Sequence, residues 1–373
     1  AQSFMGGGTG RGVVTPEKDS LALLELRHYL DSVRDATGRA TVALVLSGGG
    51  AKGATHVGVI KYLEENKVPV DLVVGTSVGG LVGGFYALGY DSNFLDSLIR
   101  NMDWDKALSD VIPREYKSYA NIKYKERYAL SFPFFYPQDA YQDQVEDNLK
   151  YSKEANRHGE LHLGANPANN TSALVAGNLS SSLPSGLIFG QNVNNILNSL
   201  SVGYQDSLDF KKLPIPYVCV ATDMVSGKTK VWYDGNISTA MRSTMSIPGL
   251  FAPVRLNGMV LVDGGMRDNY PADIARAAGA DFIIGVDLNS GYKTYGTVNN
   301  LSDIISQGVD MLSREAYEYT SQIPDINIRP DIEGYGMLSF QKASIDTLIG
   351  RGYRAAVAMA DEIAVLSELV GNE

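Results

Sequence analysis

Residues 42–90 contain two apolar runs that each end in glycines and continue into a helical pattern. The first run is VALVL (42–46), followed by the glycine loop SGGGAKG (47–53) and a helix to about Asn66. The second is a strand expected at 70–74, followed by a turn and a helix over 78–90. Strands and helices that alternate in this order are typical of a parallel sheet with crossover helices, so we predict an α/β domain.

A membrane-spanning helix is the alternative for residues 72–90, because LVVGTSVGGLVGGFYALGY carries no charge and is long enough to cross a bilayer. Its first residues favour a strand, however, and a Gly-Thr-Ser turn interrupts it. Its six glycines would also destabilise an isolated helix. A buried strand, a sharp turn and a helix that packs closely on a sheet explain the pattern better.

Further strands and helices are expected outside residues 42–90, most of them in the C-terminal half. Strands are expected at 215–223, 228–234, 258–265, 281–287 and 326–329, and helices at 21–38, 271–279, 300–320 and 344–370. Residues 1–20 are glycine-rich and polar, and we predict a flexible segment there. Residues 110–200 lack the pattern and are interpreted as a lid-like insertion. The prediction is one domain over residues 21–373, a three-layer α/β/α fold with a mostly parallel central sheet.

Composition and net charge limit the classes of partner that the protein can bind. Apolar residues make up 44% of the 373 residues and charged residues 20%, as in soluble proteins with a large core. The net charge of −10 and the lack of a Lys/Arg-rich run argue against a nucleic-acid partner. Cys219 is the single cysteine and is expected in the core. The start at Ala1-Gln2 suits a cleaved signal peptide, which favours export to the cell envelope or periplasm and leaves a cytoplasmic location open.

The residues GTSVG (75–79) match the G-x-S-x-G pattern of a nucleophile elbow, with a strand before and a helix after. Gly75 and Gly79 remove collisions two residues either side of the serine. We therefore predict that Ser77 is a nucleophile at the carboxyl edge of the sheet, near the positive end of the following helix. A structural turn is the alternative.

Counting histidines excludes a Ser-His-Asp triad in the chain order of the α/β-hydrolases, because no histidine follows residue 162. His28 is expected on the N-terminal helix, His56 on a helix face that could approach the site, and His158 and His162 in loops of the insertion.

A carboxylate can serve as the base instead. Asp263 ends the apolar strand in GMVLVDGG (258–265), and catalytic groups gather at the carboxyl edge of open α/β sheets. We expect Ser77 and Asp263 to lie together on that edge, where an apolar environment would make the carboxylate more basic. A turn-forming role for Asp263 is the alternative.

The glycine loop also fits a dinucleotide site, since Gly48, Gly50 and Gly53 match G-x-G-x-x-G and Asp71 follows about twenty residues later. In that fold the acidic residue lies at the carboxyl end of the second strand, whereas Asp71 comes at its start. The P-loop pattern is absent, so we expect no nucleotide. The loop instead offers backbone N–H groups that suit the oxyanion formed when Ser77 attacks an ester.

Together, GGGAKG (48–53), GTSVG (75–79) and DGG (263–265) resemble the patatin-like phospholipase family in order and context. The resemblance covers about 42–90 and 213–290, and residues 263–288 are similar to the bacterial branch. It implies a dyad of Ser77 as nucleophile and Asp263 as base. The implied oxyanion donors are Gly48, Gly49 and Gly50, and the implied supporting residues are Lys52, Gly53, Gly75, Gly79, Gly264 and Gly265.

We therefore predict a serine acyl hydrolase of the phospholipase A or lysophospholipase type, which acts on lipid esters at a membrane or micelle surface without a metal or other cofactor. One alternative is an acyltransferase that uses the same acyl-enzyme. Another is a non-catalytic lipid-binding protein of the cell envelope. The aromatic residues Phe132, Phe134, Phe135 and Tyr136 are interpreted either as packing for the insertion or as part of a lid.

Overall fold

The structure, a computed structural model, describes residues 17–109, 186–188, 190–204, 207–289, 291–292, 294–296, 298–299 and 301–371. All of them belong to one compact unit, which residues 1–110 and 185–373 form. Most of the expected insertion lies outside the described residues, as do the aromatic residues at 132–136, His158 and His162. The lid-like role of that insertion and the flexibility of the first residues therefore stay predictions.

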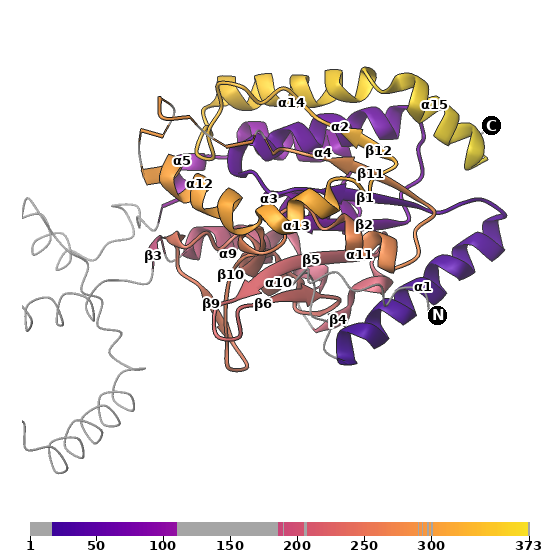
Figure 1. Ribbon diagram of the computed structural model, residues 1–373, viewed down its shortest axis with the longest axis horizontal. Helices are drawn as coiled ribbons and strands as arrows, with labels where there is room; N and C mark the ends of the chain where they lie inside the picture. Colours follow the sequence, from indigo (N-terminus) through magenta and orange to yellow (C-terminus); the bar gives the residue numbers. More distant parts are fainter. Residues whose placement is uncertain are drawn as a thin grey trace, which may run out of the picture. The chain divides into compact units, whose positions relative to one another are not determined.

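An eight-stranded sheet runs through the middle of this unit (Figure 1). Its strands are β1 (Val42–Leu46), β2 (Leu72–Thr76), β5 (Tyr217–Asp223), β6 (Lys228–Trp232), β9 (Val254–Leu256), β10 (Met259–Asp263), β11 (Phe282–Val286) and β12 (Ile326–Ile328). They follow the order β12-β11-β1-β2-β5-β10-β9, with β6 also paired to β5. Five neighbouring strands run parallel, namely β12, β11, β1, β2 and β5. Strands β6 and β10 are antiparallel to β5. The predicted mostly parallel sheet is confirmed.

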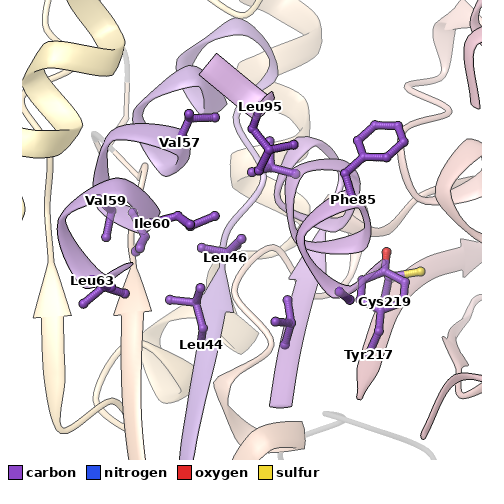
Figure 2. Packing of buried hydrophobic residues seen from close by; sticks show 14 of the residues in the cluster. Leu44, Leu46, Val57, Val59, Ile60, Leu63, Phe85, Leu95, Tyr217 and Cys219 are labelled. Atoms are coloured by element: carbon purple, nitrogen blue, oxygen red, sulfur yellow. The ribbon is translucent and has the colours of Figure 1, made fainter. Parts of the chain in front are cut away.

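Helices cover both faces of the sheet, because side chains of a strand point alternately to opposite sides. Leu44 and Leu46 of β1 point toward α2 (Ala54–Glu65), as Figure 2 shows. On this side the core also includes residues of α3 (Val78–Ala87), α4 (Ser92–Asn101), α10 (Ile237–Thr244), α14 (Lys342–Val357) and α15 (Ala360–Leu369). Ala43 and Val45 belong to a second core, with α1 (Glu17–Thr37) and α11 (Ala272–Ala277). The fold is therefore the predicted three-layer α/β/α arrangement.

The uncharged stretch 72–90 divides into β2, a turn at Ser77 and α3, as predicted. No helix in the described part of the chain is long and apolar enough to span a membrane. Shorter elements complete the unit. They are β3 (Gly186–Ile188), β4 (Leu208–Asp209), β7 (Asp234–Gly235), β8 (Gly249–Phe251), α5 (Trp104–Ala107), α9 (Gln191–Leu200), α12 (Leu301–Leu312), α13 (Arg314–Thr320), and the 3₁₀ turns η1 (Gly50–Gly53), η3 (Val202–Tyr204), η4 (Phe210–Lys212) and η5 (Gly264–Met266).

The direction of β10 corrects the expectation that Asp263 ends a strand at the carboxyl edge of the parallel sheet. Thr76 of β2 pairs with Val220, Asp263 of β10 pairs with Ala221, and β6 occupies the other edge of β5. Because β10 runs antiparallel, its carboxyl end points toward that of β2, and the two strands meet end to end. A two-residue hairpin turn with positive φ at Asn257 (49°) and Gly258 (78°) joins β9 to β10.

Candidate active site

Ser77 occupies the tight turn between β2 and α3 with φ 55° and ψ −127°, a backbone conformation that is strained for any residue except glycine. A Cβ atom at Gly75 would lie 2.5 Å from the carbonyl oxygen of Gly79. One at Gly79 would lie 2.2 Å from the carbonyl oxygen of Leu46. Gly75 therefore gives room for the start of α3, and Gly79 for the end of β1, so both glycines of the motif remove backbone collisions, as the sequence predicted.

Thr244, at the end of α10, holds the turn from the other side. The backbone N–H of Ser77 donates to Thr244 Oγ1 at 2.8 Å, and the Thr244 hydroxyl donates in turn to the carbonyl oxygen of Val220 in β5. All of these groups are buried. Sequence reasoning missed Thr244, because nothing in its local pattern marks a residue that lies 167 positions from Ser77.

The side chains of Ser77 and Asp263 form a hydrogen-bonded pair. The Ser77 hydroxyl donates to Asp263 Oδ2 at 2.6 Å, and the second carboxylate oxygen accepts the Gly265 N–H at 2.8 Å. Ser77 is 5% exposed and Asp263 2%. Burial raises the pKa of Asp263 to about 6, and the hydrogen bonds from Ser77 and Gly265 limit that rise. The carboxylate is therefore ionised at neutral pH and more basic than an exposed aspartate.

The two glycines after Asp263 allow the chain to turn under the site. A Cβ atom at Gly264 would lie 2.2 Å from the carbonyl oxygen of Val220. A Cβ atom at Gly265 would lie 2.7 Å from Asn269 Oδ1 and 3.0 Å from Asp263 Oδ1. Side chains at positions 264 and 265 would therefore prevent the turn that brings the Gly265 N–H to the Asp263 carboxylate.

The glycine loop differs in one respect from the predicted set of three oxyanion donors. The Gly48 N–H already donates to the backbone oxygen of Asn269 at 3.1 Å, so it is not available for an oxyanion. The Ala51 N–H donates to Met337 O at 2.8 Å. Between them, Gly49 and Gly50 donate to no acceptor among the described residues, and both line the pocket at Ser77. The candidate donors are therefore these two amides.

Gly48 is needed for space instead. A Cβ atom there would lie 2.3 Å from Asn269 Oδ1 and 3.1 Å from Ser77 Cβ, so no side chain fits between the loop and the elbow. Gly53 is similar, because a Cβ atom would lie 2.4 Å from the side chain of Val78. Both glycines let the loop approach the start of α3.

His56 holds the first residue of the glycine loop by a hydrogen bond and takes no part in the Ser77–Asp263 pair. It is fully buried, and its Nε2 is 2.9 Å from the carbonyl oxygen of Ser47. Burial lowers the pKa of His56 to about 4, so the ring is neutral and its Nε2–H donates to this oxygen. His28 is exposed on α1, and Cys219 is a buried core residue, as predicted.

A pocket opens beside Ser77 and Asp263. Its lining joins the glycine loop and Lys52 to residues from distant parts of the chain, namely Ile247, Asn269, Leu288, Ser306, Val309, Asp310 and Met337. Ser306, Val309 and Asp310 come from α12, which sequence reasoning treated only as a C-terminal helix. Asn269 follows the DGG motif closely, and that proximity is the one signal that could have identified it.

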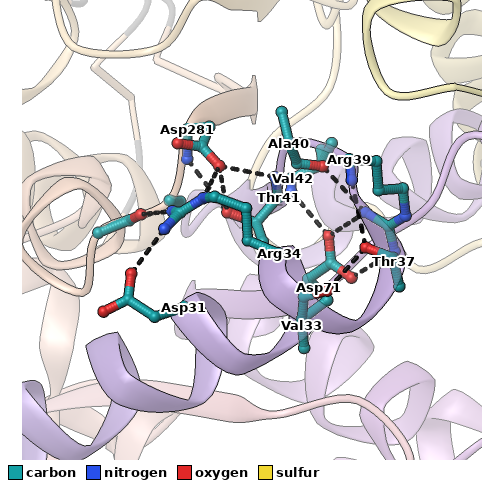
Figure 3. Close-up of polar contacts among 12 residues, drawn as sticks. Asp31, Val33, Arg34, Thr37, Arg39, Ala40, Thr41, Val42, Asp71 and Asp281 are labelled. Atoms are coloured by element: carbon teal, nitrogen blue, oxygen red, sulfur yellow. Dashed lines mark hydrogen bonds and ion pairs between the residues drawn. The ribbon is translucent and has the colours of Figure 1, made fainter.

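Asp71 lies at the opposite end of β2 from the elbow. Its carboxylate accepts two hydrogen bonds from the Arg39 guanidinium, at 2.8 and 2.7 Å, and one from the Val42 N–H at 2.8 Å (Figure 3). It therefore ties the segment before β1 to the start of β2. This position confirms that the acidic residue is at the wrong end of the strand for a dinucleotide site.

A family profile described as Patatin-like phospholipase matches residues 44–276. The chain is 28% identical to human patatin-like phospholipase domain-containing protein 6 over 256 residues, which are 68% of this chain and 14% of that protein. It is 26% identical to lysophospholipase NTE1 of Meyerozyma guilliermondii over 347 residues, 86% of this chain and 19% of that protein. The chain thus spans less than a fifth of the length of these relatives. VipD from Legionella pneumophila superimposes with a TM-score of 0.46 at 16% identity, over 87% of this chain and 67% of that one.

Proposed function

The chain belongs to the patatin-like phospholipase family, and from this premise we propose that it is a serine acyl hydrolase that cleaves fatty-acyl esters of lipids, of the phospholipase A or lysophospholipase type. The observation that carries the proposal is the 2.6 Å hydrogen bond from Ser77 Oγ to Asp263 Oδ2. It lies in a pocket that Gly49 and Gly50 also line, and the N–H groups of these two glycines donate to no acceptor among the described residues. A nucleophile, a base and two oxyanion donors are the groups that acyl transfer requires.

In the first half-reaction, Ser77 Oγ attacks the acyl carbon while Asp263 takes the hydroxyl proton. The ester carbonyl oxygen becomes an oxyanion, which the N–H groups of Gly49 and Gly50 stabilise. The carbon–oxygen bond to the leaving alcohol then breaks, and the alcohol receives the proton from Asp263. The acyl group stays on Ser77 as an ester.

In the second half-reaction, Asp263 takes a proton from water, and the hydroxide attacks the acyl-enzyme through a second oxyanion. The fatty acid leaves as Ser77 recovers its proton. None of the described residues that line the pocket is a histidine, so the carboxylate is the available base. Its raised pKa, about 6, makes it a stronger base than an exposed aspartate.

The test is to compare Ser77→Ala and Asp263→Asn with the parent chain in hydrolysis of a short-chain nitrophenyl ester. We expect Asp263→Asn to lose about 10²–10⁴-fold in turnover, since an amide cannot take the proton. A fluorophosphonate should label Ser77, and Ser306→Ala, which removes another serine of the pocket, should still be labelled. Near-full turnover by folded Asp263→Asn would refute the dyad.

Fatty-acid release from phospholipid vesicles, with and without an alcohol acceptor, separates the proposed hydrolase from the two alternatives. A hydrolase releases fatty acid in water alone, an acyltransferase needs the acceptor, and a lipid-binding protein releases none. The lipid partner at a membrane or micelle surface belongs to the proposal, and export to the cell envelope stays a prediction.

A further inference from the structure

One side of helix α12 (Leu301–Leu312) lines the pocket, and the other side leaves three large apolar side chains exposed to solvent. Ser306, Val309 and Asp310 line the pocket. With about 3.6 residues per turn, Ile304, Met311 and Leu312 lie on the opposite side of the helix. They are 59%, 62% and 59% exposed. A surface helix normally buries its apolar side chains, so three large apolar residues left exposed on one side of α12 are unusual.

A further exposed aromatic side chain, Tyr292, lies close to the C-terminal end of α12. Arg314 follows Leu312 by two residues, and its guanidinium carbon lies 5.2 Å from the ring centroid of Tyr292, which is 51% exposed. We name the set Tyr292, Ile304, Met311 and Leu312 the outer apolar face. Three exposed apolar side chains on one side of α12, together with Tyr292 beside Arg314, are a candidate interaction surface. The inner side of that helix is the pocket wall.

We propose, on the basis of the proposed function, that the outer apolar face docks on a zwitterionic lipid bilayer that carries the substrate. An amphipathic helix with an apolar exposed side can lie in the plane of a lipid–water interface. A tyrosine suits the edge of such a contact, since its ring is apolar and its hydroxyl polar. Docking would place the bilayer one helix away from Ser77, so a lipid leaving the membrane has a short path to the pocket.

Charge selects a zwitterionic surface over an anionic one. The charged residues of α12 are Asp303 and Asp310, both acidic, and the chain has a net charge of −10. Arg314, which borders the face, is paired with Glu318 at 2.7 Å. An anionic bilayer would repel the acidic chain, and salt would screen that repulsion.

The test measures flotation with phosphatidylcholine vesicles, in a Ser77→Ala background so that the lipid is not consumed. The double variant Ile304→Ser, Met311→Ser should bind vesicles at least about tenfold more weakly, because two apolar side chains no longer leave water on docking. The matched control is Val357→Ser with Val365→Ser, which removes two side chains of α14 and α15 that are 44% and 57% exposed. The control should bind like its parent. Phosphatidylglycerol vesicles should bind more weakly at low salt, with a smaller difference at high salt.

A second measurement separates docking from catalysis. With Ser77 intact, Ile304→Ser with Met311→Ser should hydrolyse a short soluble ester at the parent rate and phospholipid vesicles more slowly. The proposal is overturned if the parent does not float, if the double variant floats like the parent, or if the control loses as much. Equal losses on soluble ester and vesicles would assign the face to pocket structure, and a dimer abolished by the double variant without any flotation would assign it to contact between copies. Failure of the proposed function would appear separately, as turnover that survives in Asp263→Asn.

Discussion

Ser77, which directly follows β2, and Asp263, the last residue of β10, meet because these two strands point their carboxyl ends at each other along the same edge of β5. Thr76 pairs with Val220 and Asp263 with the next residue, Ala221. The 2.6 Å hydrogen bond between the two side chains therefore spans the gap between two strands of one sheet. Backbone pairing on a single strand sets the distance between nucleophile and base, which is a rigid way to hold a catalytic geometry.

The pH dependence of turnover should report the ionisation of Asp263. Because burial raises its pKa to about 6 and the base must be ionised, kcat/KM on a soluble ester should rise through pH 6 and level off above it. The midpoint should change little with temperature, since ionising a carboxyl group releases little heat, whereas a histidine midpoint would fall on warming. A midpoint near pH 4, or one that shifts strongly with temperature, would contradict the assignment.

The free energy of unfolding should also depend on the ionisation of Asp263, but it should fall as the carboxyl group ionises, whereas turnover rises. The pKa of Asp263 is about 6 in the folded state against 3.8 for an exposed aspartate, so the folded state holds the proton more tightly. Its stabilising contribution is complete below pH 3.8 and is lost as the pH rises through 6. Asp263→Asn should therefore gain about 2 kcal/mol in free energy of unfolding relative to the parent between pH 4 and pH 8. Urea titrations at the two pH values measure this, and a constant difference would contradict it.

Ser77→Gly should unfold at a higher denaturant concentration than Ser77→Ala. Both variants remove the hydroxyl that donates a hydrogen bond to Asp263. They therefore differ mainly in how easily the backbone at position 77 adopts its φ of 55°. Glycine adopts this conformation without the steric cost that alanine has, and we expect a difference of about 1 kcal/mol in the free energy of unfolding. Chemical denaturation of the two inactive proteins, under identical conditions, checks it. Equal stability would show that the turn relaxes when the hydroxyl is absent.

Thr244→Val should lower turnover more than it changes KM, whereas Thr244→Ser should preserve both. Valine leaves the Ser77 N–H and the Val220 carbonyl without their partner, at a cost of about 1–3 kcal/mol in stability. The nucleophile then loses the bond that fixes its turn, so the loss should appear in kcat. Steady-state kinetics on a soluble ester, with thermal unfolding alongside, measures both effects. Rescue by serine is the expected sign that the hydroxyl matters, and parent-like kinetics for valine would exclude a positioning role.

Asp71→Ala should weaken the fold and leave the chemistry intact. The carboxylate accepts hydrogen bonds from Arg39 and from the Val42 N–H, and its loss leaves a largely buried guanidinium without its partner. Among the described residues, Arg39, 20% exposed, would keep only its hydrogen bond to the carbonyl oxygen of Ala40, and we expect a loss of about 2 kcal/mol in the free energy of unfolding. Turnover on a soluble ester, measured well below the unfolding temperature, should equal that of the parent. A large loss of turnover in the folded variant would give Asp71 a functional role that its position at the far end of β2 does not support.

Local sequence patterns were sufficient to predict several features of this protein. Apolar periodicity and glycine positions identified β1 with its observed bounds, the division of residues 72–90 into strand, turn and helix, and Ser77 as the residue at the elbow. These features follow from short-range sterics, because a collision such as that at Gly79 arises from backbone that every elbow of this kind must share. The Asn257-Gly258 pair is also a local hairpin signal, and reading it would have indicated that the strand of Asp263 belongs to an antiparallel hairpin.

Long-range packing determines which groups meet at the site and which are already hydrogen-bonded elsewhere. The direction of β10, the bond that takes the Gly48 N–H, the support from Thr244 and the pocket wall of α12 all depend on contacts between segments far apart in the chain; Ser77 and Asp263 alone are separated by 186 positions. A hydrogen bond forms between whichever donor and acceptor packing brings together, and the residue types alone do not encode that choice. Local sequence therefore specifies the candidate nucleophile and base, whereas long-range packing specifies their distance and the amides left to receive an oxyanion.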